Sequence, residues 1–121
     1  MKTALITGGA SGLGRAHALR LASEGYAVAI LDISEEGLVE TSRQSENIHP
    51  FLCDVTDLEA VRSVTQSVIK THGPVDRLVH GPAIMPGGLL LETEAELISR
   101  VMQVNYCGMV NVCQTILPAM V

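Results

Sequence analysis

The stretch TGGASGLG, residues 7–14, decides the fold. It follows a short apolar run, residues 3–7, and it precedes a segment in which apolar side chains recur at helical spacing. A turn this tight between a strand and a helix needs residues that tolerate positive φ, as glycine does. The N–H groups and the positive dipole end of the helix then favour a phosphate. We interpret the stretch as a turn that binds the pyrophosphate of a nucleotide, rather than as an ordinary glycine-rich turn.

Three further strands are predicted. Residues 27–31 (AVAIL) are uniformly apolar, which is typical of a parallel strand covered on both faces. Residues 76–80 (DRLVH) indicate another strand. Residues 48–53 form a weaker candidate that contains Pro50, and it should therefore lie at a sheet edge or start late.

Helical patterns separate these strands. The first ends at Gly25, and the second covers residues 34–44. Two capping boxes, at residues 56–59 and 93–96, predict the starts of a third helix and of a long fourth one. In the first box we expect Thr56 to be the cap. Alternating strands and helices imply an α/β fold in which one domain, residues 1–121, forms a parallel sheet with helices on both faces.

Composition narrows the function. Of the 121 residues, 47% are hydrophobic and 17% are charged, which excludes a disordered chain. With 2% aromatic residues and a net charge of −5, nucleic acid is not an expected partner. The apolar runs are too short to span a membrane, and the start of the sequence lacks the hydrophobic region of a signal peptide. Three cysteines without CxxC spacing favour a reducing, cytoplasmic setting over disulfides or zinc. The four scattered histidines suggest no metal site.

Asp32 ends the second predicted strand. An acidic residue about 20 positions past the glycine turn accepts hydrogen bonds from the ribose of a dinucleotide. Its charge repels a 2′-phosphate, and neither Ser11 nor Ile33 offers a basic side chain to attract one. The sequence therefore favours NAD over NADP. The alternative is that Asp32 only caps the next helix, which Ser34 could do instead.

The motif at residues 7–14 resembles the TGxxxGxG motif of the short-chain dehydrogenases/reductases. Asp32 resembles the acid of that family that selects NAD. Asp54 and Val55 resemble its Asp-Val pair after the third strand, where the Asp meets the adenine. Asn105, within VNYCG, resembles the Asn that holds a water in the family's proton relay. The resemblance covers the whole chain and the N-terminal half of the family's proteins. It implies a Rossmann-like, doubly wound parallel sheet, truncated to about four strands.

The resemblance also implies a set of site residues. Gly8, Ser11, Gly12, Leu13 and Gly14 are expected at the pyrophosphate and the groups next to it. Asp32 is expected at the ribose, and Asp54 and Val55 at the adenine. The backbone at Gly81 and Ala83 is expected to pass near a cofactor ribose, and Asn105 is expected to serve the proton relay.

Two departures from the family stand out. Where the family usually carries NNAG, this chain has residues 80–83, HGPA, and His80 is expected to be structural rather than catalytic. The catalytic YxxxK of the family is absent, because neither Tyr26 nor Tyr106 has a lysine four positions further on. In the family that lysine lowers the pKa of the tyrosine, which then exchanges a proton with the substrate.

Three interpretations follow. The first is an oxidoreductase that transfers hydride between NAD(H) and a small alcohol or ketone, with this chain as the cofactor-binding half and with Ser, Tyr and Lys supplied by a longer frame or a partner chain. We expect the 121 residues alone to be inactive, and we expect a homo-oligomer that uses the helix around residues 93–117. The second is a nucleotide-binding or interaction module without chemistry. The third is an inactive, truncated gene product.

Overall fold

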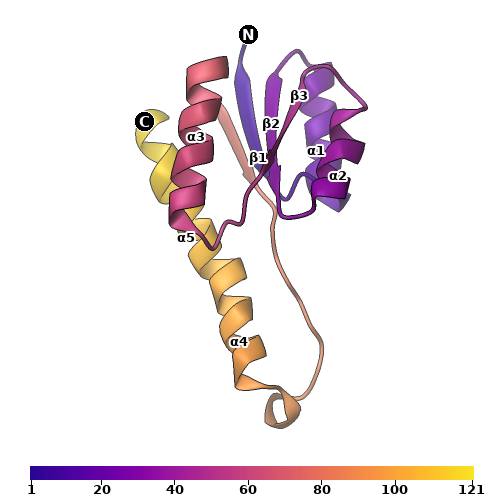
Figure 1. Cartoon of the computed structure of the whole chain (residues 1–121), viewed down its shortest axis with the longest axis vertical. Helices are drawn as coiled ribbons and strands as arrows, with labels where there is room; N and C mark the ends of the chain where they lie inside the picture. Colours follow the sequence, from indigo (N-terminus) through magenta and orange to yellow (C-terminus); the bar gives the residue numbers. More distant parts are fainter.

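Four parallel strands form one sheet in the order β3-β2-β1-β4, in a computed structural model that describes all 121 residues (Figure 1). The strands are β1 (Thr3–Thr7), β2 (Ala27–Asp32), β3 (Ile48–Leu52) and β4 (Arg77–His80). Each pairing is parallel. The predicted fold is confirmed, and the strand that contains Pro50 lies at a sheet edge as expected, since proline lacks the N–H of an inner strand.

Helices cover both faces of the sheet (Figure 1). On one face lie α1 (Gly12–Ser23) and α2 (Glu35–Ser42). On the other lie α3 (Leu58–His72) and α5 (Gly108–Ile116). Every residue of β1 is buried, because the central strands carry apolar side chains toward both layers.

Side chains alternate between two apolar clusters. Ile6 and Ile30 pack toward α1 and α2, and their neighbours Leu5 and Leu31 pack toward α3 and α5. The register places Leu5 beside Ala29 of β2 and Leu78 of β4. Because all four strands are parallel, their carboxyl ends meet along one side of the sheet.

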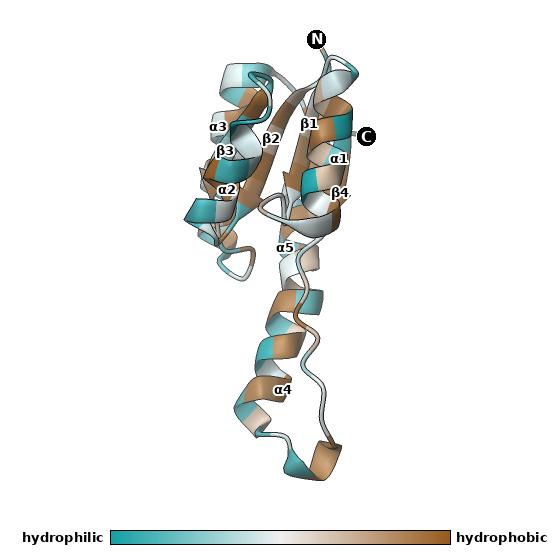
Figure 2. Cartoon of the chain, turned by 90° about the vertical axis from the view of Figure 1, so that its right-hand side faces the viewer, coloured by the Kyte–Doolittle hydropathy of each residue, from teal (hydrophilic) through white to brown (hydrophobic).

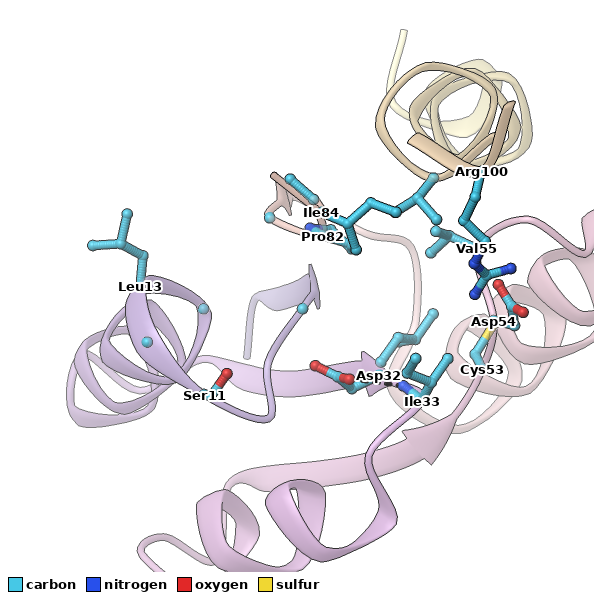
Figure 3. A pocket seen from close by; sticks show the side chains of 17 residues that line it. Ser11, Leu13, Asp32, Ile33, Cys53, Asp54, Val55, Pro82, Ile84 and Arg100 are labelled. Carbon is cyan, nitrogen blue, oxygen red and sulfur yellow. Dashed lines mark hydrogen bonds between the residues drawn. The ribbon is translucent and has the colours of Figure 1, made fainter. Parts of the chain in front are cut away.

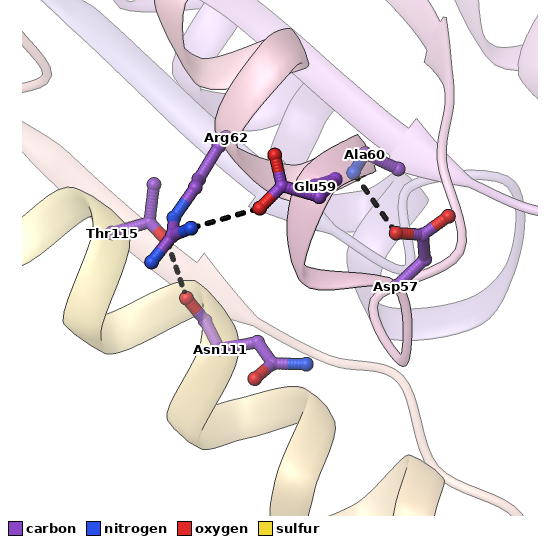
Figure 4. A network of polar contacts seen from close by, with 6 residues as sticks. All are labelled: Asp57, Glu59, Ala60, Arg62, Asn111 and Thr115. Carbon is purple, nitrogen blue, oxygen red and sulfur yellow. Dashed lines mark hydrogen bonds and ion pairs between the residues drawn. The ribbon is translucent and has the colours of Figure 1, made fainter.

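The two predicted capping boxes do not form. Asp57, not Thr56, caps α3, because the carboxylate of Asp57 accepts the N–H of Ala60 at 3.2 Å (Figure 4). The hydroxyl of Thr56 instead donates to Asp54 Oδ1 at 2.7 Å. In the second box, Thr93 lies two positions before the start of α4, and its hydroxyl donates to the carbonyl of Leu89. In both boxes the threonine hydroxyl donates to a nearby oxygen and does not cap the helix N-terminus.

The long C-terminal helix is interrupted. It consists of α4 (Ala95–Met102), a π-helical turn (Gln103–Cys107) and α5, and it ends in a 3₁₀ turn (Leu117–Ala119). Such π turns widen a helix by one residue and are frequent at functional sites. Residue 105, one of the predicted site positions, lies inside this turn.

Residues 81–102 form an arm that projects away from the sheet (Figures 1 and 2). The arm consists of an extended loop, a 3₁₀ turn (Leu90–Glu92) and α4. Its exposed apolar side chains are Met85, Leu89, Leu90, Leu91, Leu97, Ile98 and Met102. None of the helices has the length and apolar character needed to cross a membrane.

Candidate functional site

A cavity of about 440 Å³ opens at the carboxyl ends of the strands (Figure 3). Its wall takes a segment from the end of each strand, including Gly8 after β1, Asp32 in β2, Cys53 after β3 and Gly81 after β4. Ligands of open α/β sheets bind at this edge, where the strand order reverses. The cavity brings together ten of the predicted site residues: Gly8, Ser11, Gly12, Leu13, Gly14, Asp32, Asp54, Val55, Gly81 and Ala83.

The glycine turn folds back tightly on itself. Gly8 has a φ of +75°, a region that favours glycine. A Cβ on Gly14 would overlap the carbonyl oxygen of Gly8, so residue 14 has room for hydrogen only. The turn thus brings the backbone of Gly8, Gly12 and Gly14 to the cavity, and only Ser11 and Leu13 add side chains there.

The N-terminus of α1 is open to an anion. Ser11 precedes the helix without capping it through its side chain, and the first turn contains no acidic residue. By contrast, Ser34 caps α2 and Asp57 caps α3, and acidic residues follow both caps. The first N–H groups of a helix have no partner within it, and they carry its positive dipole end. This end of the cavity therefore favours a phosphate group.

Hydrogen bonds of Arg15 and Thr41 hold the glycine turn in place, and the sequence analysis predicted neither residue. The hydroxyl of Thr41 donates to the carbonyl of Gly9 at 2.9 Å and accepts Arg15 Nε at 2.9 Å. The Arg15 guanidinium also donates to the carbonyl of Ala10. Thr41 is fully buried. A hydroxyl on the apolar face of the second predicted helix is the signal that could have pointed to it, since buried polar groups need partners.

The carboxylate of Asp32 connects β2 to the glycine turn. Its Oδ2 accepts the N–H of Ala10 at 3.1 Å, and its Oδ1 accepts the N–H groups of Ile33 and Ser34 at 2.7 and 3.1 Å. The cap of α2 is the hydroxyl of Ser34, which accepts the N–H of Gly37. Asp32 is therefore not the cap of the next helix, and its half-buried carboxylate lies in the cavity wall.

Asp54 lies at the opposite wall. Its Oδ1 accepts both the hydroxyl and the N–H of Thr56, and these hydrogen bonds hold the pKa of the carboxyl below its usual range, with a smaller contribution from the charge of Arg100. Burial, together with the charges of Asp54 and Asp57, raises the pKa of the Cys53 thiol to about 11. Cys53 is therefore a protonated, unreactive thiol at neutral pH.

The departure from NNAG is accommodated at β4. His80 Nδ1 lies 2.6 Å from Thr7 Oγ1, and this oxygen also accepts the N–H of Gly81 at 3.3 Å. His80 Nε2 is buried without a partner. Burial lowers the pKa of His80, which favours the neutral ring. His80 bonds to the neighbouring strand and does not line the cavity.

Asn105 lies beside the cavity rather than in its wall. Its Oδ1 accepts the N–H of Ile84 at 2.8 Å, and its Nδ2 donates to the carbonyl of Ile84 at 2.9 Å. The side chain thus joins the π turn to the loop after β4. A role of Asn105 in a proton relay stays a prediction.

The strand order β3-β2-β1-β4 matches the first four positions of the Rossmann order 3-2-1-4-5-6, and the site lies where that fold binds its dinucleotide. The fold is thus that of the dinucleotide-binding class of α/β proteins. The family model for short chain dehydrogenases matches residues 2–121. The chain belongs to the short-chain dehydrogenase/reductase family, as its motifs predict.

Curated relatives agree with this assignment. A 3-oxoacyl-[acyl-carrier-protein] reductase of Thermotoga maritima is 36% identical, over 99% of this chain and 50% of the relative. Epidermal retinol dehydrogenase 2 of Homo sapiens is 34% identical, over 97% of this chain and 40% of the relative. The chain spans at most about half the length of these two relatives.

Solved structures match the fold closely. An actinorhodin polyketide ketoreductase with NADPH superposes with a TM-score of 0.93 at 32% identity, over 98% of this chain and 47% of that one. An NAD⁺-bound xylitol dehydrogenase gives a TM-score of 0.93 at 31% identity, over 98% of this chain and 48% of that one. These two structures contain different nucleotides, NADPH and NAD⁺, so the fold alone does not decide between them.

Proposed function

We propose that this chain is the cofactor-binding part of an oxidoreductase that transfers hydride between NAD(H) and a small alcohol or ketone. One observation carries the proposal. The cavity places the uncapped N-terminus of α1 and the carboxylate of Asp32 on one wall, where a diphosphate and its ribose need a donor and an acceptor. Its volume of about 440 Å³ lies within the range of small-molecule sites.

Each wall has a separate role in this proposal. The N–H groups of residues 12–14 and the hydroxyl of Ser11 donate to the pyrophosphate. Asp32 accepts from the ribose hydroxyls, and Asp54 and Val55 meet the adenine. The backbone at Gly81 and Ala83 lies along the second ribose. A nicotinamide cofactor held by these residues would supply an acceptor for the hydride of the carbinol carbon, and a base would take the hydroxyl proton.

NAD is proposed over NADP on electrostatic grounds. The charge of Asp32 opposes a 2′-phosphate at the ribose that it binds. Its two neighbours at the cavity rim, Ser11 and Ile33, carry no positive charge to offset that repulsion.

A binding module without chemistry is the second candidate, and one observation favours it. Tyr26 immediately precedes β2, so it lies at the amino ends of the strands, whereas the cavity lies at their carboxyl ends. Its ring packs against Arg77. Tyr106 is 56% exposed in the π turn, and neither tyrosine has a lysine four residues on. We therefore propose that these 121 residues turn over no alcohol by themselves. For the oxidoreductase proposed first, Ser, Tyr and Lys would then come from further chain or from a partner.

We also propose self-association through the helix around residues 93–117. On this helix the side chain of Met102 is 54% exposed and that of Tyr106 is 56% exposed, and an apolar surface of this kind favours burial against another surface. A cytoplasmic setting is proposed with it, because Cys53, Cys107 and Cys113 are all free thiols.

Isothermal titration calorimetry of the purified chain tests the proposed function. We expect NAD to bind, and we expect Gly14→Ala to weaken the binding of NAD by at least about tenfold, since the added Cβ overlaps the carbonyl of Gly8 and must distort the glycine turn. Gly87→Ala is the matched control, because a Cβ there meets open space. A wild-type chain that binds no NAD, or a Gly14→Ala variant that binds it normally, would contradict the proposal. NADH production from alcohols by the chain, lost in Asn105→Ala, would contradict the predicted inactivity.

A further inference from the structure

Arg100 is a cationic side chain in the cavity wall that forms no hydrogen bond within the protein. It extends from α4 toward Asp54, and its guanidinium lies beside that carboxylate in Figure 3. The two ion pairs of the molecule, Arg20–Glu24 and Arg62–Glu59, are elsewhere, and no hydrogen bond to the protein uses Arg100. A guanidinium carries five N–H donors in a planar fork. These donors are available to whatever occupies the cavity.

Asp54 complements this cation. Both of its hydrogen bonds go to Oδ1, so Oδ2 is left as an acceptor at the same wall. Val55 and Val104, both buried, line the cavity next to this pair and offer apolar surface to a flat ring. This end of the cavity therefore presents one acceptor and one set of donors side by side, bordered by aliphatic side chains.

We propose that Arg100, paired with Asp54, is a specificity-determining residue that selects an adenine base. The proposal rests on the proposed function, which brings a nucleotide base to this wall. Adenine presents its 6-amino donor next to a ring-nitrogen acceptor, which matches the oxygen of Asp54 and the N–H groups of Arg100. A 6-oxopurine presents two acceptors on the same edge, and its oxygen would then face the carboxylate.

Arg100 also gives α4 a direct part in binding. The other polar groups at the cavity come from the turn and strand ends of the sheet, whereas Arg100 belongs to the arm of residues 81–102. Its position one helical turn before Val104 places the cation and the apolar wall on the same face of the helix. The arm therefore contributes to base recognition as well as carrying exposed apolar surface.

Titrations with adenosine 5′-monophosphate and inosine 5′-monophosphate test this inference, because the two differ at the 6-position. We expect the wild-type chain to prefer the adenine nucleotide. Arg100→Met should weaken the adenine nucleotide by about tenfold, the order of a charge-assisted hydrogen bond, and should reduce the preference. Arg100→Lys should restore part of both, since it keeps a donor but not the planar fork.

Controls separate the possible outcomes. Arg62→Met makes the same chemical change outside the cavity and should leave affinity unchanged. Wild-type affinity in Arg100→Met overturns the inference alone. The inference is also overturned if Arg100→Met loses much more affinity for adenosine 2′,5′-bisphosphate than for adenosine 5′-monophosphate, because Arg100 would then bind the 2′-phosphate. A wild-type chain that binds no nucleotide overturns the proposed function and this inference with it.

Discussion

The side-chain amide of Asn105 makes two hydrogen bonds to the backbone of one residue, Ile84. Ile84 lines the cavity, and it belongs to the loop that leaves β4 for the arm. The π turn that carries Asn105 thus holds that loop where the chain passes the cavity. The position of this wall depends on a side chain that is itself outside the cavity.

Asn105→Leu should release this loop. The substitution keeps the size of the side chain but leaves the N–H and carbonyl of Ile84 without partners. We expect the free energy of unfolding to fall by about 1–3 kcal/mol, measured by urea denaturation. Hydrogen exchange at the N–H of Ile84 should accelerate more than at the N–H of Ile6 in the sheet. Unchanged exchange at Ile84 would show that Asn105 does not hold the loop.

Asp32→Asn should shift the choice of nucleotide. The amide oxygen can still accept the N–H of Ala10, the amide nitrogen cannot accept the N–H groups of Ile33 and Ser34, and the negative charge is removed. We expect the affinity for NADP relative to NAD to rise by about tenfold, because a like-charge contact near a surface costs on the order of 1–2 kcal/mol. Parallel titrations with both nucleotides measure the ratio. A wild-type chain that binds NADP more tightly than NAD would refute this role of Asp32.

Thr41→Val should loosen the glycine turn. Valine replaces the buried hydroxyl by a methyl group and leaves the carbonyl of Gly9 and the Nε of Arg15 without this partner. We expect a loss of about 1–3 kcal/mol in the free energy of unfolding together with weaker NAD binding. Thr41→Ser keeps the hydroxyl and should recover most of both. If the serine variant behaves like the valine variant, packing of the methyl group, rather than hydrogen bonding, explains the effect.

Acidification should destabilise the fold through His80. Burial lowers the folded-state pKa of His80 below its usual value of 6.5, so the unfolded chain binds more protons between the two values. The contribution of His80 to the free energy of unfolding is fully present above the usual pKa of 6.5, and it is lost as the pH falls toward the folded-state pKa. Burial and the neighbouring His72 shift the pKa of His49 in the same direction. We expect the free energy of unfolding to decrease between about pH 7 and pH 5.

The variant His80→Asn isolates this contribution. It should lose less stability over the same pH range than the wild type does, as followed by urea denaturation at each pH. His17→Asn, at an exposed position of α1, is the matched control and should follow the wild-type profile. Identical pH profiles for His80→Asn and the wild type would place the pH dependence elsewhere.

The two central strands, β1 and β2, were predictable because they are short apolar runs bounded by glycine or polar residues, and buried parallel strands require that pattern. The glycine turn and Asp32 were predictable because their spacing reflects a local strand–turn–helix unit. Arg15, Thr41 and Arg100 were not predicted, because the groups that they face lie in other elements. The caps failed for a local reason, since oxygens of Asp54 and Leu89, just before the two boxes, accept the hydroxyls of Thr56 and Thr93. The π turn has no pattern in the sequence that distinguishes it from a continuous helix.

The central place of β1 has a consequence for how the chain folds. Thr7 of β1 meets His80 of β4 across 73 residues of sequence, whereas its other neighbour, β2, follows directly after one helix. Closing the longer loop costs more chain entropy and comes later, since contacts distant in sequence form slowly. A nascent chain should therefore build the glycine turn and Asp32 first. It should complete the wall at Gly81 only after β4 has emerged, so binding competence is acquired near the end of folding.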